Sequence, residues 1–165
     1  MPNEVRGDKN PAVGARAIYD AVAAAYNAAF ADKLDAKPLD RALLTAFADL
    51  AGPGLICDIG CGPGHITHFL AQRHKEIIGL DLSSAMIEIA RRHAPSLSFT
   101  VASMLNLPVA DNAWAGAVSL CSITCHEFAR VIRPGGWLLL VFHVDSPEFA
   151  AGAVNHFASW FGQCR

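Results

Sequence analysis

The sequence has no apolar run long enough to cross a membrane. The longest strongly apolar stretch, Trp137–Val144, is far shorter than the roughly 20 residues of a spanning helix. The N-terminus also lacks the apolar stretch of a signal peptide. Neither charge sign is in excess, since 13 Lys and Arg stand against 15 Asp and Glu. We therefore predict a cytoplasmic protein that binds neither membranes nor nucleic acid.

Cysteine is present in an odd number, five residues, which without an export signal favours free thiols in a reducing compartment. The spacings Cys57-x-x-x-Cys61 and Cys121-x-x-x-Cys125, with His126 next, resemble paired metal ligands. However, Cys57 lies within an apolar strand-like run and Cys61 within a glycine loop, whereas structural zinc ligands usually come from knuckle-like turns. We predict buried thiols and no metal site.

The 165 residues are 53% hydrophobic and 17% charged, which excludes a disordered chain and predicts one domain over residues 12–165 after a flexible tail at 1–11. Helical periodicity covers 12–31 and the stretch after Pro38. Beyond residue 54, short apolar runs alternate with helical segments. The expected strands are 55–59, 76–81, 97–101, 115–121 and 137–144, and the expected helices are 66–73, a segment capped by Ser83 that stops before Pro95, and 128–132. This alternation predicts a doubly wound α/β fold with a parallel sheet.

The most informative segment is the glycine loop from Asp58 to Gly64, which reads D-I-G-C-G-P-G between a predicted strand and a predicted helix. Glycines at such a place let the backbone turn tightly and approach a ligand. Asp81 ends the second predicted strand, where a carboxylate can accept hydrogen bonds from both hydroxyls of a ribose. A dinucleotide fingerprint would need a third glycine at His65 or Thr67, so its spacing fails, and no phosphate-binding G-x-x-x-x-G-K motif exists.

The D-x-G-x-G-x-G pattern resembles the first motif of the class I S-adenosylmethionine-dependent methyltransferases, in particular the small-molecule methyltransferase domain group. Further blocks resemble that family in the same order over residues 15–145. They are the lid-helix motif Tyr19-Asp-x-x-Ala-x-x-Tyr26, the second strand Gly79–Ser83 followed by Met86, the adenine-side loop Ala102–Pro108 with Asp111, and the turn Phe128–Gly136 before the fifth strand.

The resemblance implies a Rossmann-like sheet of order 3-2-1-4-5, with lid helices at 12–51, a core at 54–144 and a C-terminal helix at 145–165. It implies S-adenosylmethionine as cofactor and S-adenosylhomocysteine as product. Asp58 and the loop glycines would hold the methionine part, Asp81 the ribose, and Leu82, Ser103 and Met104 the adenine. The full implied cofactor set is Tyr26, Asp58, Gly60, Cys61, Gly62, Gly64, Asp81, Leu82, Met86, Ser103, Met104, Leu105 and Leu120.

The expected activity is methyl transfer to a small-molecule acceptor by in-line displacement. A sulfonium is a good leaving group, so such an enzyme mainly orients the acceptor and excludes water. A base is needed only for an acceptor that keeps its proton. His126 and His143 are the candidates, although each also fits an ordinary packed or solvated histidine. Phe30, Trp114 and Trp160 would favour an apolar acceptor, and the residues do not distinguish oxygen, nitrogen and carbon acceptors.

Two departures from the family pattern leave an alternative open. The connection between the fourth strand and Arg133-Pro-Gly-Gly is short, and the residues after the fifth strand are too few for the usual final antiparallel strand pair. We expect an exposed sheet edge that a homodimer could cover. The alternative function is a truncated S-adenosylmethionine-binding protein without turnover. A nicotinamide or flavin oxidoreductase is a third possibility that the glycine spacing disfavours.

Overall fold

A computed structural model describes residues 11–30, 34–74, 76–120 and 125–141. The helices are α1 (Pro11–Phe30), α2 (Pro38–Leu50), α3 (His65–Ala71), α4 (Ser84–His93) and α5 (Cys125–Val131). The strands are β1 (Ile56–Ile59), β2 (Ile77–Asp81), β3 (Ser98–Val101), β4 (Trp114–Leu120) and β5 (Ile132–Val141). No helix in these ranges is long and apolar enough to span a membrane.

The five strands form one parallel sheet in the order β3-β2-β1-β4-β5, which confirms the predicted fold. The chain moves outward from β1 through β2 to β3, then returns to the other side of β1 for β4 and β5. The topology therefore reverses between β1 and β4. In open parallel sheets, ligands bind in the crevice beyond the carboxyl ends of the strands at such a switch point.

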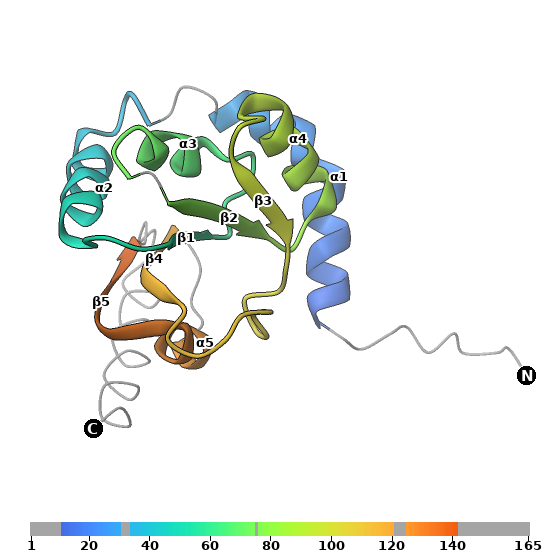
Figure 1. Ribbon diagram of the computed structural model, residues 1–165. Helices are drawn as coiled ribbons and strands as arrows, with labels where there is room; N and C mark the ends of the chain where they lie inside the picture. Colours follow the sequence, from blue (N-terminus) through green and yellow to red (C-terminus); the bar gives the residue numbers. More distant parts are fainter. Residues whose placement is uncertain (1–10, 31–33, 75, 121–124, 142–165) are drawn as a thin grey trace, which may run out of the picture.

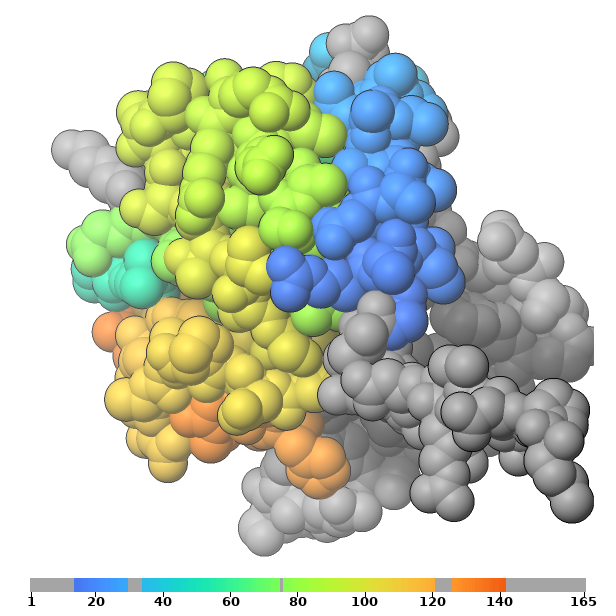
Figure 2. Space-filling view, turned by 90° about the vertical axis from the view of Figure 1, so that its right-hand side faces the viewer, coloured from blue at the N-terminus to red at the C-terminus, as the bar shows by residue number. Residues whose placement is uncertain are grey.

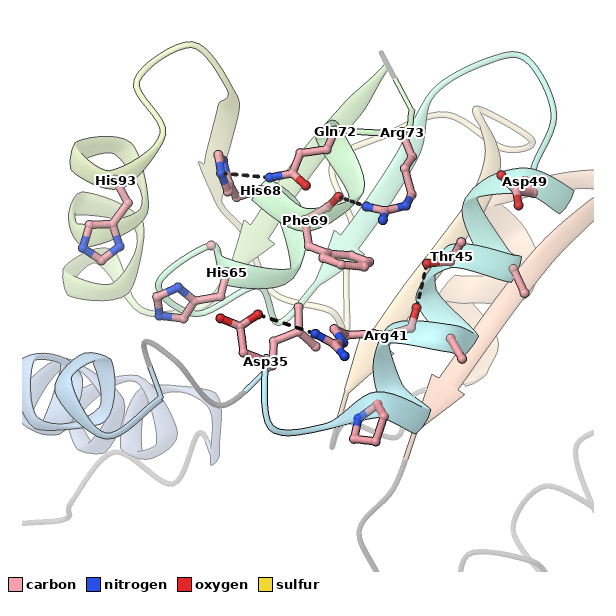
Figure 3. Close-up of a pocket in the computed structure, with 15 residues that line it drawn as sticks. Asp35, Arg41, Thr45, Asp49, His65, His68, Phe69, Gln72, Arg73 and His93 are labelled. Carbon is pink, nitrogen blue, oxygen red and sulfur yellow. Dashed lines mark hydrogen bonds and ion pairs between the residues drawn. The ribbon is translucent and has the colours of Figure 1, made fainter.

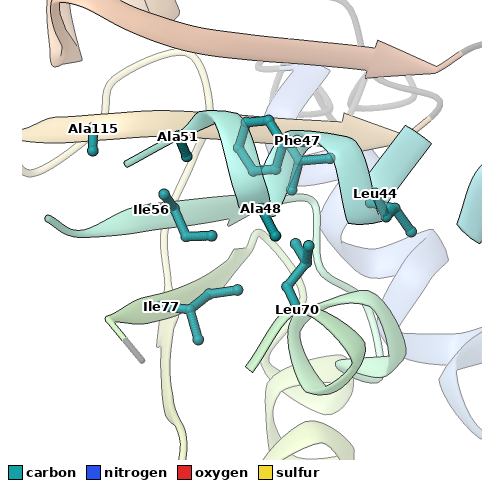
Figure 4. Close-up of a cluster of buried hydrophobic side chains, with 9 residues drawn as sticks. Leu44, Phe47, Ala48, Ala51, Ile56, Leu70, Ile77 and Ala115 are labelled. Carbon is teal, nitrogen blue, oxygen red and sulfur yellow. The ribbon is translucent and has the colours of Figure 1, made fainter. Parts of the chain in front are cut away.

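Helices cover both faces of the sheet. Successive residues of a strand point to opposite faces, so each buried strand packs against both helical layers. Ile56 of β1 joins Leu44, Phe47 and Leu70 in a cluster under α2 and α3 (Figure 4). The next residue, Cys57, joins Phe128 and Val131 of α5 on the opposite face. Figure 1 shows α2, α3 and α4 on one side of the sheet and α5 on the other.

The two N-terminal helices have different positions. Helix α2, which the sequence analysis grouped with the lid, packs on the sheet through its buried residues Leu44, Phe47 and Ala48. Helix α1 instead lies against α4, where Ala23 is buried between Met86 and Ile89. The two helices thus pack on different parts of the domain, and the lid at 12–51 stays a prediction.

The last described strand differs in its start from the prediction. β5 begins at Ile132, which pairs with Trp114, and the next paired residues are Trp137 and Gly116. The intervening turn contains Gly135 at φ +76°, so it forms an irregularity inside the strand and not a separate connection. Within the described sheet β5 is an edge strand, and Trp137 is exposed on it. Residues 142–144 of the predicted strand and the predicted helix at 145–165 lie outside the described residues.

Candidate cofactor site

The glycine loop connects β1 to α3 in a conformation that side chains disfavour. Gly60, Gly62 and Gly64 have φ angles of +76°, +52° and +84°. The amides of Gly60 and Cys61 both donate to the carbonyl oxygen of Leu80, at 2.7 and 2.9 Å. The loop is thus held against the end of β2, close to Asp81.

Two of these glycines have very different surroundings. A Cβ atom on Gly64 would lie 2.9 Å from the ring of Phe99 and 3.0 Å from Ala90, so this glycine allows α3 to pack closely on β3 and α4. A Cβ atom on Gly62 would meet only Tyr26 of α1, at 3.9 Å. Tyr26 therefore lies beside the loop, as its predicted cofactor role requires.

Asp81 stands at the carboxyl end of β2, and both its oxygens accept backbone hydrogen bonds. Oδ2 accepts from the amide of Gly62 and Oδ1 from the amide of Ser83, each at 2.8 Å. These two contacts fix the orientation of the carboxylate. Each oxygen retains capacity for a further hydrogen bond, as a ribose diol would need. Burial raises the pKa of Asp81, while the two amides oppose that rise.

Asp58 is buried at the end of β1, where its Oδ2 accepts a 2.6 Å hydrogen bond from the Thr67 hydroxyl of α3. Burial raises the pKa of Asp58 to about 7, against the lowering effect of Thr67. Among the described residues, no Lys, Arg or His forms an ion pair with Asp58 or Asp81. Two neighbouring carboxylates without a cation suit a ligand that carries a positive charge.

The raised pKa of Asp58 predicts that the stability of the ligand-free protein falls as pH rises. The folded state holds this proton more tightly than the unfolded state, so the contribution is most favourable below the unfolded pKa and is lost between about pH 4 and 7. Denaturant unfolding at pH 5 and 8 should show Asp58→Asn gaining roughly 2–3 kcal/mol on the parent over that interval. Parallel pH profiles for the two proteins would contradict this prediction.

The residues predicted to lie beside the adenine are on the loop between β3 and β4. Ser103 accepts a 3.2 Å hydrogen bond from the amide of Leu105 through its hydroxyl, and it forms an isolated bridge with Asn106. Met104 is partly buried against the α5 face of the sheet, whereas the Leu105 side chain is exposed. Of the three predicted residues Ser103, Met104 and Leu105, only Leu105 has an exposed side chain.

A guanidinium that the sequence analysis missed holds this loop in place. Arg130 of α5 donates to both carboxylate oxygens of Glu127, to Asp111 and to the carbonyl oxygens of Leu107 and Val109, at 2.7 to 3.0 Å. Glu127 in turn accepts from the amide of Leu107 at 2.7 Å. Its interaction with Arg130 lowers the pKa of Glu127 to about 2. The three-residue spacing of Glu127 and Arg130 was a visible signal for their pairing, but not for the loop that they bind.

Removal of this guanidinium should release the loop. In Arg130→Gln, we expect the amide of Leu107 to exchange with solvent at the rate of an unprotected loop amide, because Glu127 loses the partner that orients it. Arg133→Gln is the matched control, since within the described part of the chain the Arg133 side chain donates one hydrogen bond, to the carbonyl of Pro53. Hydrogen exchange followed by mass spectrometry measures both variants. Unchanged protection of Leu107 in Arg130→Gln would refute the proposed restraint.

The other predicted site residues lie in different environments. Cys61 is buried, with its Sγ donating to the carbonyl of Gly62 at 3.7 Å, and Leu82 is half-buried. Leu120 packs against the cluster under α2, and the Met86 side chain is buried in the α1–α4 contact. His126 is exposed on α5, whereas His143 lies outside the described residues. Cys57 and Cys61 are free buried thiols.

The open hollow in Figure 3 lies at a different place from the switch point between β1 and β4. It has a volume of about 880 Å³ and lies between α2, α3 and the end of α4. Its lining includes Arg41, His65, Phe69 and His93, but of the predicted cofactor residues only Gly64. The cofactor residues therefore do not gather around this hollow.

The parallel sheet of order 3-2-1-4-5, with two carboxylates at its switch point, defines a Rossmann-like domain. Residues 56–136 match the family described as a methyltransferase domain. The trans-aconitate 2-methyltransferase of Methylobacterium nodulans is 38% identical over 114 residues, 63% of this chain and 44% of that protein. The enzyme of the same name from Delftia acidovorans is 45% identical over 130 residues, 70% of this chain and 48% of that protein.

A solved structure supports the fold. The geranyl diphosphate C-methyltransferase of Streptomyces coelicolor A3(2) superimposes with a TM-score of 0.56 at 19% identity, over 73% of this chain and 54% of that one. The chain belongs to the class I S-adenosylmethionine-dependent methyltransferases. It spans less than half the length of the two trans-aconitate methyltransferases.

Proposed function

We propose that this chain binds S-adenosylmethionine beyond the ends of β1, β2 and β4 and transfers its methyl group to a small organic acceptor. The observation that carries the proposal is the orientation of Asp81 by Gly62 and Ser83, next to a second buried carboxylate, Asp58. Asp81 would accept hydrogen bonds from the ribose hydroxyls. Asp58 and the glycine loop would face the ammonium end of the methionine part.

The bound cofactor supplies a methyl group on a sulfonium, which is a good leaving group. The protein then has to hold the acceptor in line and keep water away. Glu127 and Arg130 support this task by fixing the loop beside the adenine position. Trp114 no longer supports the prediction of an apolar acceptor, because its side chain is buried in the core beside Phe128 and Val131. The side chains of Phe30 and Trp160 lie outside the described residues.

We propose a carboxylate of a small organic acid as the acceptor class. The relatives' names, trans-aconitate 2-methyltransferase and malonyl-[acyl-carrier protein] O-methyltransferase, support this choice. A carboxylate is already ionised at neutral pH, so its oxygen needs no general base. His126, which is exposed on α5, would then be dispensable, whereas an alcohol or amine acceptor would give it a role as a base.

Calorimetric titration tests the proposal. Micromolar binding of S-adenosylmethionine, with no binding of NADH, is the expected result. A folded protein that binds neither would overturn the proposed function, and binding of NADH alone would favour an oxidoreductase. Formation of S-adenosylhomocysteine in the presence of trans-aconitate then reports turnover. Tight binding without product from any oxygen, nitrogen or carbon acceptor would support the alternative of a binding protein.

We also propose a homodimer and a cytoplasmic location. The edge position of β5 and the exposed Trp137 support an association that covers this edge. The free thiols of Cys57 and Cys61 support a reducing compartment. Light scattering of the full chain at tens of micromolar should give twice the mass of the monomer, and a monodisperse monomer would overturn the dimer.

A further inference from the structure

Helix α1 contacts the cofactor site at two points six residues apart, about 9 Å along the helix axis. Near one end, Tyr26 lies beside Gly62 of the glycine loop. At the middle of the helix, Asp20 reaches the residues that follow β2. Between them the small side chain of Ala23 lets α1 approach α4 closely. Figure 2 shows the blue surface of α1 directly against the yellow-green surface of α4.

The contact of Asp20 is specific and leads back to Asp81. Asp20 Oδ1 accepts hydrogen bonds from the Ser83 hydroxyl and, at 3.1 Å, from the amide of Ala85. The Ser83 hydroxyl, which is fully buried, also accepts from the amide of Met86 at 3.1 Å and so caps α4. The backbone amide of the same Ser83 donates to Asp81 Oδ1. One residue therefore joins the carboxylate of α1 to the carboxylate expected to hold the ribose.

Helix α1 thus lies against both residues whose amides orient Asp81. Gly62 orients Oδ2 and lies beside Tyr26, while Ser83 orients Oδ1 and is bound by Asp20. Arg16 completes the arrangement, since it lies 3.7 Å from Asp20 and donates to the Ser84 hydroxyl at 3.2 Å. A displaced α1 would leave Ser83 with an unused hydroxyl donor and Asp81 with a less constrained partner.

We infer that Asp20 is a positioning residue for the nucleoside: through Ser83 it sets the orientation of Asp81, so that α1 must be docked for the ribose to bind tightly. This inference rests on the proposed function. It assigns Asp20 no contact with the ligand. A substitution of Asp20 should therefore weaken ligand binding only when Asp81 is present. A substitution that merely destabilised the fold would weaken binding whether or not Asp81 is present.

A double-mutant cycle on the full chain tests the inference, with S-adenosylhomocysteine as the probe and calorimetry as the measurement. We expect Asp20→Ala to weaken binding about tenfold in the parent, and to have little effect in an Asp81→Asn background. Asp20→Asn, which keeps an acceptor for Ser83 and Ala85, should recover most of the affinity. Glu88→Gln, which removes one negative charge from the exposed side of α4, is the control and should bind like the parent.

The outcomes separate the inference from the proposed function. If the parent does not bind the probe, the proposed function fails. If the parent binds and Asp20→Ala binds equally well, the inference alone fails. Equal losses in the parent and in the Asp81→Asn background would also overturn it, since Asp20 would then act on the fold as a whole. Should Asp20→Ala not fold, a tenfold gap between Asp20→Asn and Asp20→Leu would still support the inference, and equal affinities would overturn it.

Discussion

Replacement of Asp81 by alanine is expected to weaken the binding of S-adenosylmethionine at least about a hundredfold, because two hydrogen bonds to a charged acceptor are lost. The same change leaves the amides of Gly62 and Ser83 without their acceptor, so the glycine loop also loses a restraint. Calorimetric titration of the parent and of Asp81→Ala measures the loss.

The control for this prediction is Asp49→Ala, which removes a negative charge from the exposed side of α2 and should leave affinity unchanged. Asp81→Asn keeps the size of the side chain and should still lose at least about tenfold, because the amide nitrogen can accept neither from a ribose hydroxyl nor from a backbone amide. Parent-like affinity in both Asp81 variants would show that the nucleoside does not bind at the end of β2.

A large loss of stability is expected for Gly64→Ala. An alanine there would hold a positive φ, which costs about 1–2 kcal/mol, and its Cβ atom would press on Phe99 and Ala90 at about 3 Å. Overpacking of a core contact adds about 1–3 kcal/mol, so the total loss should be roughly 2–5 kcal/mol. That is a large fraction of the stability of a typical domain.

Gly62→Ala is the matched control, because it has the same backbone requirement without the crowding. Its φ is also positive, but the nearest atom to an added Cβ is Tyr26 Cε1 at 3.9 Å. Denaturant unfolding should give a loss of only about 1–2 kcal/mol for this variant. Equal losses for the two glycines would mean that Phe99 and Ala90 move aside, and that the close packing of α3 on α4 matters little.

The strand order and most element positions could be predicted because the relevant signals are local. Apolar runs of strand length alternate with helical periodicity, and the predicted N-cap Ser83 does accept a hydrogen bond from the amide of Met86. The loop glycines, which were expected to allow a tight turn of the backbone, have positive φ angles. Asp81 faces the loop because parallel strands end at the same edge of the sheet.

Interactions between distant residues were not predictable. Asp20 and Ser83 are 63 positions apart, and Asp20 alone reads as an ordinary acidic residue on a helix. Trp114 was interpreted as part of an acceptor site, but a buried strand contacts helices on both faces, and this face is filled by α5. The apolar periodicity of α2 predicted that one side of the helix is buried. It did not indicate that this side packs against the sheet.

The strand order also sets the sequence in which this domain can assemble. Ile56 of β1 pairs with Ile77, 21 residues later, and on its other side with Gly116, 60 residues later. Local pairings form faster than distant ones, so β1, α3 and β2 can associate while the opposite edge of β1 is still open. During synthesis that edge stays unpaired until β4 leaves the ribosome. The switch point between β1 and β4 is thus completed late, and an interrupted chain would expose the edge of β1, a normally buried strand, to aggregation.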